Sequence, residues 1–249
     1  NSLKNILRED LDKITYSGEW KNMVEEFHAE LEELKKRVVK MGNLAQDMLD
    51  KSVKSLKEQD TDLAKEVLNC KNDIAQMDEE IEQDALKLLT LFQPMAKDMR
   101  EMATVLKLIT YLARIGRYGK DIANITLELS GKPHVKELVS IPYMAKEVDS
   151  MISDALTAFE NEDVESINGF TAREKTVDEL RYSIFRECLT YMMEDSKTIK
   201  RCARYIMVAR YLERCGDHAV KMTEKIYYMV TGEHIDLDPP GPTPDCNLD

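Results

Sequence analysis

The stretch VLKLITYLARIGRYGKDIANITLEL (residues 105–129) has a counterpart one hundred positions later, YIMVARYLERCGDHAVKMTEKIYYM (residues 205–229). In both stretches apolar residues recur at alternating steps of three and four, the spacing of one buried face on an α-helix. The shift superimposes Val105, Leu108, Leu112, Ile115, Ile122 and Leu129 on Tyr205, Val208, Leu212, Cys215, Met222 and Met229. The pattern predicts two equivalent long helices and indicates an internal repeat.

The repeat extends to the residues that precede each stretch. Residues 27–48 and 63–81 carry the same helical spacing, and a turn at Asp60 or Thr61 separates them by capping the next helix. A shift slightly above one hundred brings Met48 onto Met151 and Asp60 onto Asp163. We therefore predict an all-α fold built by tandem duplication of a three-helix bundle, with six long helices.

Turn residues set the expected boundaries. Gly131 and Pro133 are typical of a helix end, so the first repeat is placed at residues 19–131, after an N-terminal extension at 1–18. The stretch KPHVKELVSIP (132–142) is the expected linker, and residues 143–233 form the second repeat. Residues 234–249 are proline-rich without a helical pattern, which predicts a disordered C-terminal tail.

Composition narrows the classes of function. A net charge of -12 over 249 residues disfavours a nucleic-acid partner. No stretch of about 20 apolar residues and no signal-peptide core is present, which leads us to expect a cytoplasmic protein. The five cysteines form no CxxC pair, so a thiolate zinc site is not expected. Phosphate-binding glycine loops and nucleophile elbows are absent as well, and we expect no enzymatic activity.

Two pairs of carboxylates mark the second repeat. Glu213 and Asp217 lie four residues apart, as do Glu174 and Asp178. Like charges at this spacing face each other and oppose helix formation by roughly 0.2–0.5 kcal/mol. Two neighbouring helices carrying such pairs would form a four-carboxylate site for a hard cation. Alternatively, Arg210 and Lys221 neutralise the acids on a solvated face.

The first repeat lacks all four carboxylates. Lys71 and Ala75 occupy the positions of Glu174 and Asp178, while Ala113 and Arg117 occupy those of Glu213 and Asp217. Because basic residues oppose a cation, one metal site is predicted and not two. A separate basic run, SKTIKRCARY, places Lys197, Lys200, Arg201 and Arg204 before the last long helix. This run is either a solvated helix start or a contact for a phosphate or an acidic partner.

The duplicated layout, the closing LERCGDHAVKMTEKIYYMVTGE and its weaker copy LARIGRYGKDIANITLELSGK resemble the PhoU family of phosphate-uptake regulators. The resemblance covers about residues 20–235. It implies two three-helix bundles with a surface metal cluster held by E(D)xxxD motifs. Carried over to this chain, the ligands are Glu174, Asp178, Glu213 and Asp217, and His218 and Arg210 would lie around them. Iron is the expected metal, with zinc, manganese or magnesium as alternatives.

The resemblance also implies partners. Members of the family act beside the ATPase of the phosphate ABC transporter and, in bacteria, beside a sensor histidine kinase. We therefore expect a cytoplasmic adaptor, peripheral to the membrane through its partner, with homodimer formation compatible with the fold. The alternative hypothesis is a metal-binding or metal-storage protein whose carboxylate cluster is its main function.

Overall fold

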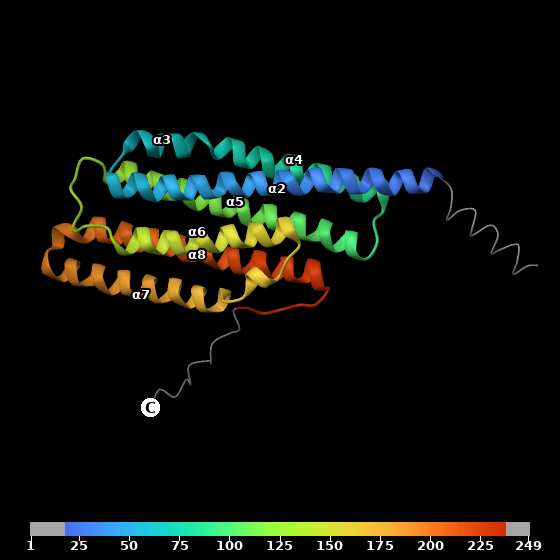
Figure 1. The fold of residues 1–249 in the computed structure, drawn as a ribbon. Coiled ribbons are helices and arrows are strands. Elements are labelled where there is room, and N and C mark those ends of the chain that lie inside the picture. Colours follow the sequence, from blue (N-terminus) through green and yellow to red (C-terminus); the bar gives the residue numbers. More distant parts are fainter. Residues whose placement is uncertain (1–17, 238–249) are drawn as a thin grey trace, which may run out of the picture.

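The computed structural model describes residues 18–237 and shows two helical layers along a common axis (Figure 1). The residues described contain helices and turns but no β-strand. In chain order the elements are α2 (Gly18–Glu58), α3 (Thr61–Asn69), α4 (Lys71–Phe92), α5 (Lys97–Leu129), α6 (Ser140–Asn161), the 3-10 helix η1 (Glu165–Ile167), α7 (Phe170–Glu194), η2 (Ser196–Thr198) and α8 (Ile199–Thr231).

The predicted duplication is confirmed. Helices α2, α3/α4 and α5 pack together as the first bundle, and α6, α7 and α8 as the second. Contacts of α5 with α8 and of α2 with α6 join the two bundles side by side (Figure 1). The six-helix prediction holds with one refinement, because the second helix of the first bundle is divided into α3 and α4 at Cys70.

The turn before α3 forms as its sequence predicts. The Asp60 side chain accepts hydrogen bonds from the backbone N–H groups of Asp62 (2.9 Å) and Leu63 (3.0 Å). These two amides lie in the first turn of α3 and have no partner within the helix, so the carboxylate caps them. The start of α3 is therefore encoded locally.

One continuous core runs through both bundles. The predicted apolar positions of the two long central helices are buried: Val105, Leu108, Leu112, Ile115, Ile122, Leu129, Tyr205, Val208, Leu212, Cys215, Met222 and Met229. Burial of this apolar surface, at about 25 cal/mol per Å² removed from water, is the main stabilising contribution. Because α5 and α8 carry these residues on faces that also meet each other, they form the centre of the molecule.

A partly buried ion network links the two bundles at the end of α6. The Glu162 carboxylate accepts hydrogen bonds from Lys35 Nζ (2.7 Å) on α2 and Lys97 Nζ (2.8 Å) on α5. These bonds, that from Lys35 first, hold the pKa of Glu162 below its usual value. Burial alone would lower the pKa of Lys35, but its bonds to Glu162 and Glu32 outweigh this effect and raise it. The network therefore stays charged at neutral pH.

Two predicted boundaries differ from the structure. Helix α6 begins at Ser140, inside the expected linker, because Pro142 lies in its first turn, where a missing N–H is tolerated. The first residues of the expected tail are packed: Leu237 is buried, and its carbonyl accepts a hydrogen bond from Thr171 Oγ1 (3.1 Å). The prediction of disorder for 238–249, like the extension at 1–17, falls outside the described residues.

Candidate functional site

The two carboxylate pairs lie on the helices expected for them. Glu174 and Asp178 are half-buried on α7, one turn apart, and Glu213 and Asp217 are on α8. The two helices pack directly against each other along the second bundle. The sequence thus predicted correctly which two helices carry the acidic residues.

Arginine side chains contact the α8 pair. Glu213 is buried, and its carboxylate forms ion pairs with Arg181 on α7 (Nε to Oε1, 3.2 Å) and with Arg210 one turn before it. The buried Arg181 Nε–H is not directed into a good hydrogen bond. Asp217 pairs with Arg214, with 2.8 Å between Nη1 and Oδ2. The repulsion between Glu213 and Asp217 is therefore offset by three guanidinium groups in this structure.

This arrangement does not fit a metal cluster as it stands. Within residues 18–237, no group of three or more His, Cys, Asp or Glu side chains is arranged to hold a metal ion. A cation at Glu213 would have to displace Arg181 and Arg210, which already neutralise its charge. The sequence analysis missed Arg181, although its position three residues after Asp178 places it on the same face of α7.

The equivalent positions of the first bundle come together in space. Lys71, Ala75, Ala113 and Arg117 all line one cavity of about 170 Å³ between α4 and α5. Their convergence supports the alignment of the two repeats, because residues from two separate helices, α4 and α5, meet as the repeat requires. Three cationic groups line this cavity, namely Lys71 and Arg117 at the predicted positions and also Lys120, and Asp78 is the one acid among the lining residues.

His218 lies at the interface between the bundles. Its ring stacks on those of Tyr111 (5.6 Å between centroids) and Tyr118 (6.0 Å), both on α5. Tyr118 also stacks on Tyr211 of α8 at 5.5 Å. Because Tyr211 and His218 are the repeat equivalents of Tyr111 and Tyr118, the four rings form an aromatic cluster with pseudo-twofold symmetry. His218 Nε2 is buried there without a hydrogen-bond partner.

The environment of His218 favours its neutral form. Burial is the main cause that lowers the pKa of His218 to about 4. The charge of Arg114 lowers this pKa further, Asp217 opposes it with a smaller effect, and Arg214 adds the smallest lowering effect. A neutral imidazole stacked on tyrosines contributes to packing between the bundles. Its contacts assign His218 to the inter-bundle interface.

A second feature of α7 was not predicted. Tyr182, Phe185, Leu189 and Met193 are exposed, with 88% of the Met193 surface accessible. Their spacing of three, four and four residues places them on one face of α7. We call these four residues the α7 stripe. A row of exposed apolar side chains of this kind is typical of a surface that binds another protein.

Comparison with known proteins shows to which protein family the chain is related. The PhoU domain model matches residues 38–126 and again residues 141–226, one match in each bundle. The chain belongs to the PhoU family. The two matches cover most of both repeats, which agrees with the internal duplication.

Relatives extend the match over nearly the whole fold. The phosphate-specific transport system accessory protein PhoU of Escherichia coli is 32% identical over 213 residues, which covers 86% of this chain and 88% of that protein. A PhoU homolog of Caulobacter vibrioides is 35% identical and covers 85% and 93%. The crystal structure of PhoU from Pseudomonas aeruginosa superimposes with a TM-score of 0.80 at 32% identity, covering 83% of this chain and all of that one.

A further solved structure matches with lower sequence identity. The phosphate transport system regulatory protein PhoU from Streptococcus pneumoniae has a TM-score of 0.77 at 26% identity, and the match covers 84% of this chain. None of the helices in residues 18–237 has an apolar stretch that could span a bilayer. Fold and family are thus established.

Proposed function

We propose that this PhoU-family chain is a non-enzymatic regulator of phosphate uptake. It acts as a cytoplasmic adaptor on the ATPase of a phosphate ABC transporter, on a phosphate-sensing kinase, or on both. The observation that carries the proposal is the match, over both repeats, to proteins named as accessory to phosphate-specific transport. A relative covered almost from end to end supports a shared role better than a match to one domain would.

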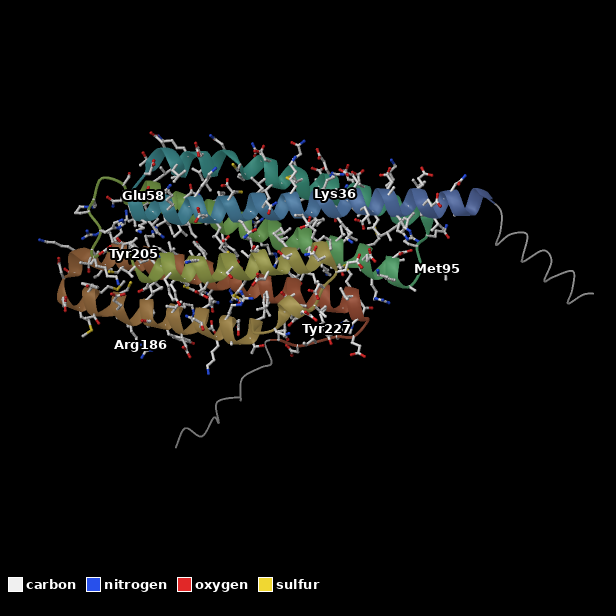
Figure 2. All side chains as sticks on the ribbon, viewed as in Figure 1. Lys36, Glu58, Met95, Arg186, Tyr205 and Tyr227 are labelled. Carbon is white, nitrogen blue, oxygen red and sulfur yellow. The ribbon has the colours of Figure 1, made fainter. Side chains whose placement is uncertain are left out.

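The α7 stripe is the surface that we propose for the partner. Its four side chains lie on α7, which carries the labelled Arg186 and runs along the lower side of the molecule in Figure 2. The next helical turns toward the α7 N-terminus carry Asp178 and Glu174, so apolar and acidic surface follow each other along one helix. An apolar centre beside a charged rim is the usual composition of a protein–protein interface.

Replacing Phe185 and Leu189 by serine should weaken binding to the transporter ATPase by about tenfold or more, because apolar side chains at the centre of an interface carry much of its energy. The measurement is co-purification, followed by titration of the purified ATPase from the same organism. The wild-type chain should bind, and the Phe185→Ser/Leu189→Ser variant should not be recovered with the ATPase at matched concentrations.

A matched control is available in the first bundle. Leu86 and Leu91 are also exposed and apolar, and Leu86→Ser/Leu91→Ser removes a similar surface without touching α7. This control should bind as the wild type does. Loss of binding in both variants would show that the α7 stripe is not the contact surface. Failure of the wild-type chain to bind either the ATPase or a phosphate-sensing kinase would contradict the adaptor role.

Metal binding at the second bundle is a separate proposal. The four carboxylates predicted as ligands lie on α7 (Glu174 and Asp178) and on α8 (Glu213 and Asp217). However, Arg181 and Arg210 contact Glu213. A metal and these guanidinium groups exclude each other, since both neutralise the same carboxylate. We therefore propose that a cation binds only when both Arg181 and Arg210 move away from Glu213.

The Arg181→Ala variant should accordingly take up more metal than the wild-type chain, whereas Glu213→Ala/Asp217→Ala should take up none. Elemental mass spectrometry of protein purified without chelators measures the iron, zinc and manganese content of each. Circular dichroism verifies that the variants are folded. If wild type and Arg181→Ala are both metal-free after incubation with ferrous, manganese and zinc salts, the predicted metal site is wrong. No observation on the described residues favours metal storage as the main function.

A further inference from the structure

Two segments that are distant in sequence meet at one end of the molecule. The loop that follows α5 and the turn that leads through η2 into α8 both lie at this end (Figure 1). Between them is a cavity of about 430 Å³. Its lining consists of Glu128, Leu129, Lys132, Pro133, Lys197, Lys200 and Arg201. We call it the basic end pocket.

The charges of this pocket are strongly unbalanced. Lys132, Lys197, Lys200 and Arg201 contribute four positive charges, and Glu128 is the one acid among the lining residues. Glu128 is already matched, because Arg204 Nε (2.8 Å) and Lys200 Nζ (3.1 Å) form ion pairs with its carboxylate. Hydrogen bonds from Arg204 and then Lys200 also lower the pKa of Glu128. The pocket therefore keeps an excess of positive charge at neutral pH.

Hydrogen bonds fix the walls of the pocket. An Arg201 Nη1–H donates to the Pro133 carbonyl at 2.6 Å, which ties the start of α8 to the loop. Gln59 Nε2 donates to the Lys132 carbonyl at 2.6 Å, which ties the loop to the turn after α2. The Asp195 side chain caps the backbone N–H of Lys197. Because these hydrogen bonds hold the three segments together, the cationic groups remain close to one another without a ligand.

Two of the ammonium groups have no acidic partner in the part of the chain that the structure describes. In residues 18–237 the side chains of Lys132 and Lys197 form no ion pair, although the whole chain carries 47 acidic residues against 35 basic ones. The net charge of -12 does not prevent an anion from binding, because charges more than about 8 Å away are screened at physiological ionic strength. Local cations therefore decide what binds here.

We propose that the basic end pocket binds a compact oligophosphate, a short chain of linked phosphate groups. Four cations spread over a cavity of this volume match several anionic groups in a row better than a single one. The lining contains no aromatic ring on which a nucleobase could stack, which favours the phosphate chain over a nucleotide. The pocket shares no residue with the α7 stripe, although Met193 lies only four residues before Lys197, and its proposed ligand is a small anion and not a protein.

The test is calorimetric titration of the purified full chain with inorganic triphosphate, pyrophosphate and phosphate in 150 mM sodium chloride without divalent ions. Triphosphate should bind more tightly than pyrophosphate, and pyrophosphate more tightly than phosphate. In the Lys132→Gln/Lys197→Gln variant the affinity for triphosphate should fall about tenfold. Both positions are exposed, so the variant should fold normally, as circular dichroism will verify.

The control variant removes two positive charges elsewhere. Lys71→Gln/Arg117→Gln neutralises the first-bundle cavity and should leave triphosphate affinity unchanged. An equal loss in both variants would indicate attraction by overall charge and overturn the proposal. The proposal also fails if triphosphate does not bind the wild-type chain at millimolar concentration, or if citrate competes as well as triphosphate does.

Discussion

Lowering the pH from 7 to 4 should reduce the free energy of unfolding by about 3 kcal/mol through a single side chain, His218. Its pKa is about 4 in the folded chain, below its ordinary value of 6.5. The unfolded chain therefore takes up a proton at higher pH than the folded chain does. The contribution of neutral His218 to the free energy of unfolding is fully present above pH 6.5. It declines as the pH falls from 6.5 to 4 and does not change further below pH 4.

The His218→Phe variant isolates this effect. Phenylalanine keeps an aromatic ring against Tyr111 and Tyr118 but removes the buried Nε2 that has no partner. Urea unfolding of both proteins at pH 7, 6, 5 and 4 gives the comparison. Carboxylates titrate in both, so the difference between the two curves belongs to His218. The free energy of unfolding of the variant should be close to that of the wild type at pH 7 and about 3 kcal/mol higher than that of the wild type at pH 4. Parallel curves would show that His218 does not titrate in this way.

Gly119→Val should destabilise the fold by about 2–3 kcal/mol, because position 119 of α5 lies close against the backbone of α2. A β-carbon at position 119 would lie 3.0 Å from the carbonyl carbon and oxygen of Met48 and 3.2 Å from the Leu49 nitrogen. These are main-chain atoms, which cannot move away unless the whole of α2 shifts. The midpoint of urea unfolding should fall accordingly.

Gly216→Ala is the matched control, with an expected change of the opposite sign. A β-carbon there would meet Val177 Cγ1 at 3.5 Å and Val148 Cγ2 at 3.8 Å, which are ordinary contact distances. Since alanine favours a helix over glycine by about 1 kcal/mol, this variant should be more stable than the wild type. If both substitutions changed stability in the same direction and to the same extent, close backbone approach would not be the reason for glycine at position 119.

The fold follows from the sequence because it depends on local and periodic information. The spacing of Leu108, Leu112 and Ile115, and of their equivalents Val208, Leu212 and Cys215, is sufficient to define one buried face per helix. The repeat then fixes the order of the helices. The break at Cys70 was not predicted, since no proline or glycine marks it.

The candidate sites depend on contacts that periodicity does not encode. The sequence correctly placed Glu213 and Asp217 on one helix, and it named Arg210 as a neutralising partner. It did not show that Arg181, 32 positions before Glu213, would reach the same carboxylate from α7. His218 was expected beside the acidic pairs, yet its ring stacks on α5 of the other bundle.

By itself the sequence determined the all-α architecture, the duplication and the helix faces, because each follows from the 3.6-residue period and from capping residues close by in the chain. Tertiary structure alone decided which charges meet. The partners of Glu213, the aromatic surroundings of His218 and the convergence of Lys132 with Lys197 depend on how whole helices pack against each other. Such packing is set by the sum of many side-chain contacts across the core, and no short stretch of sequence contains it.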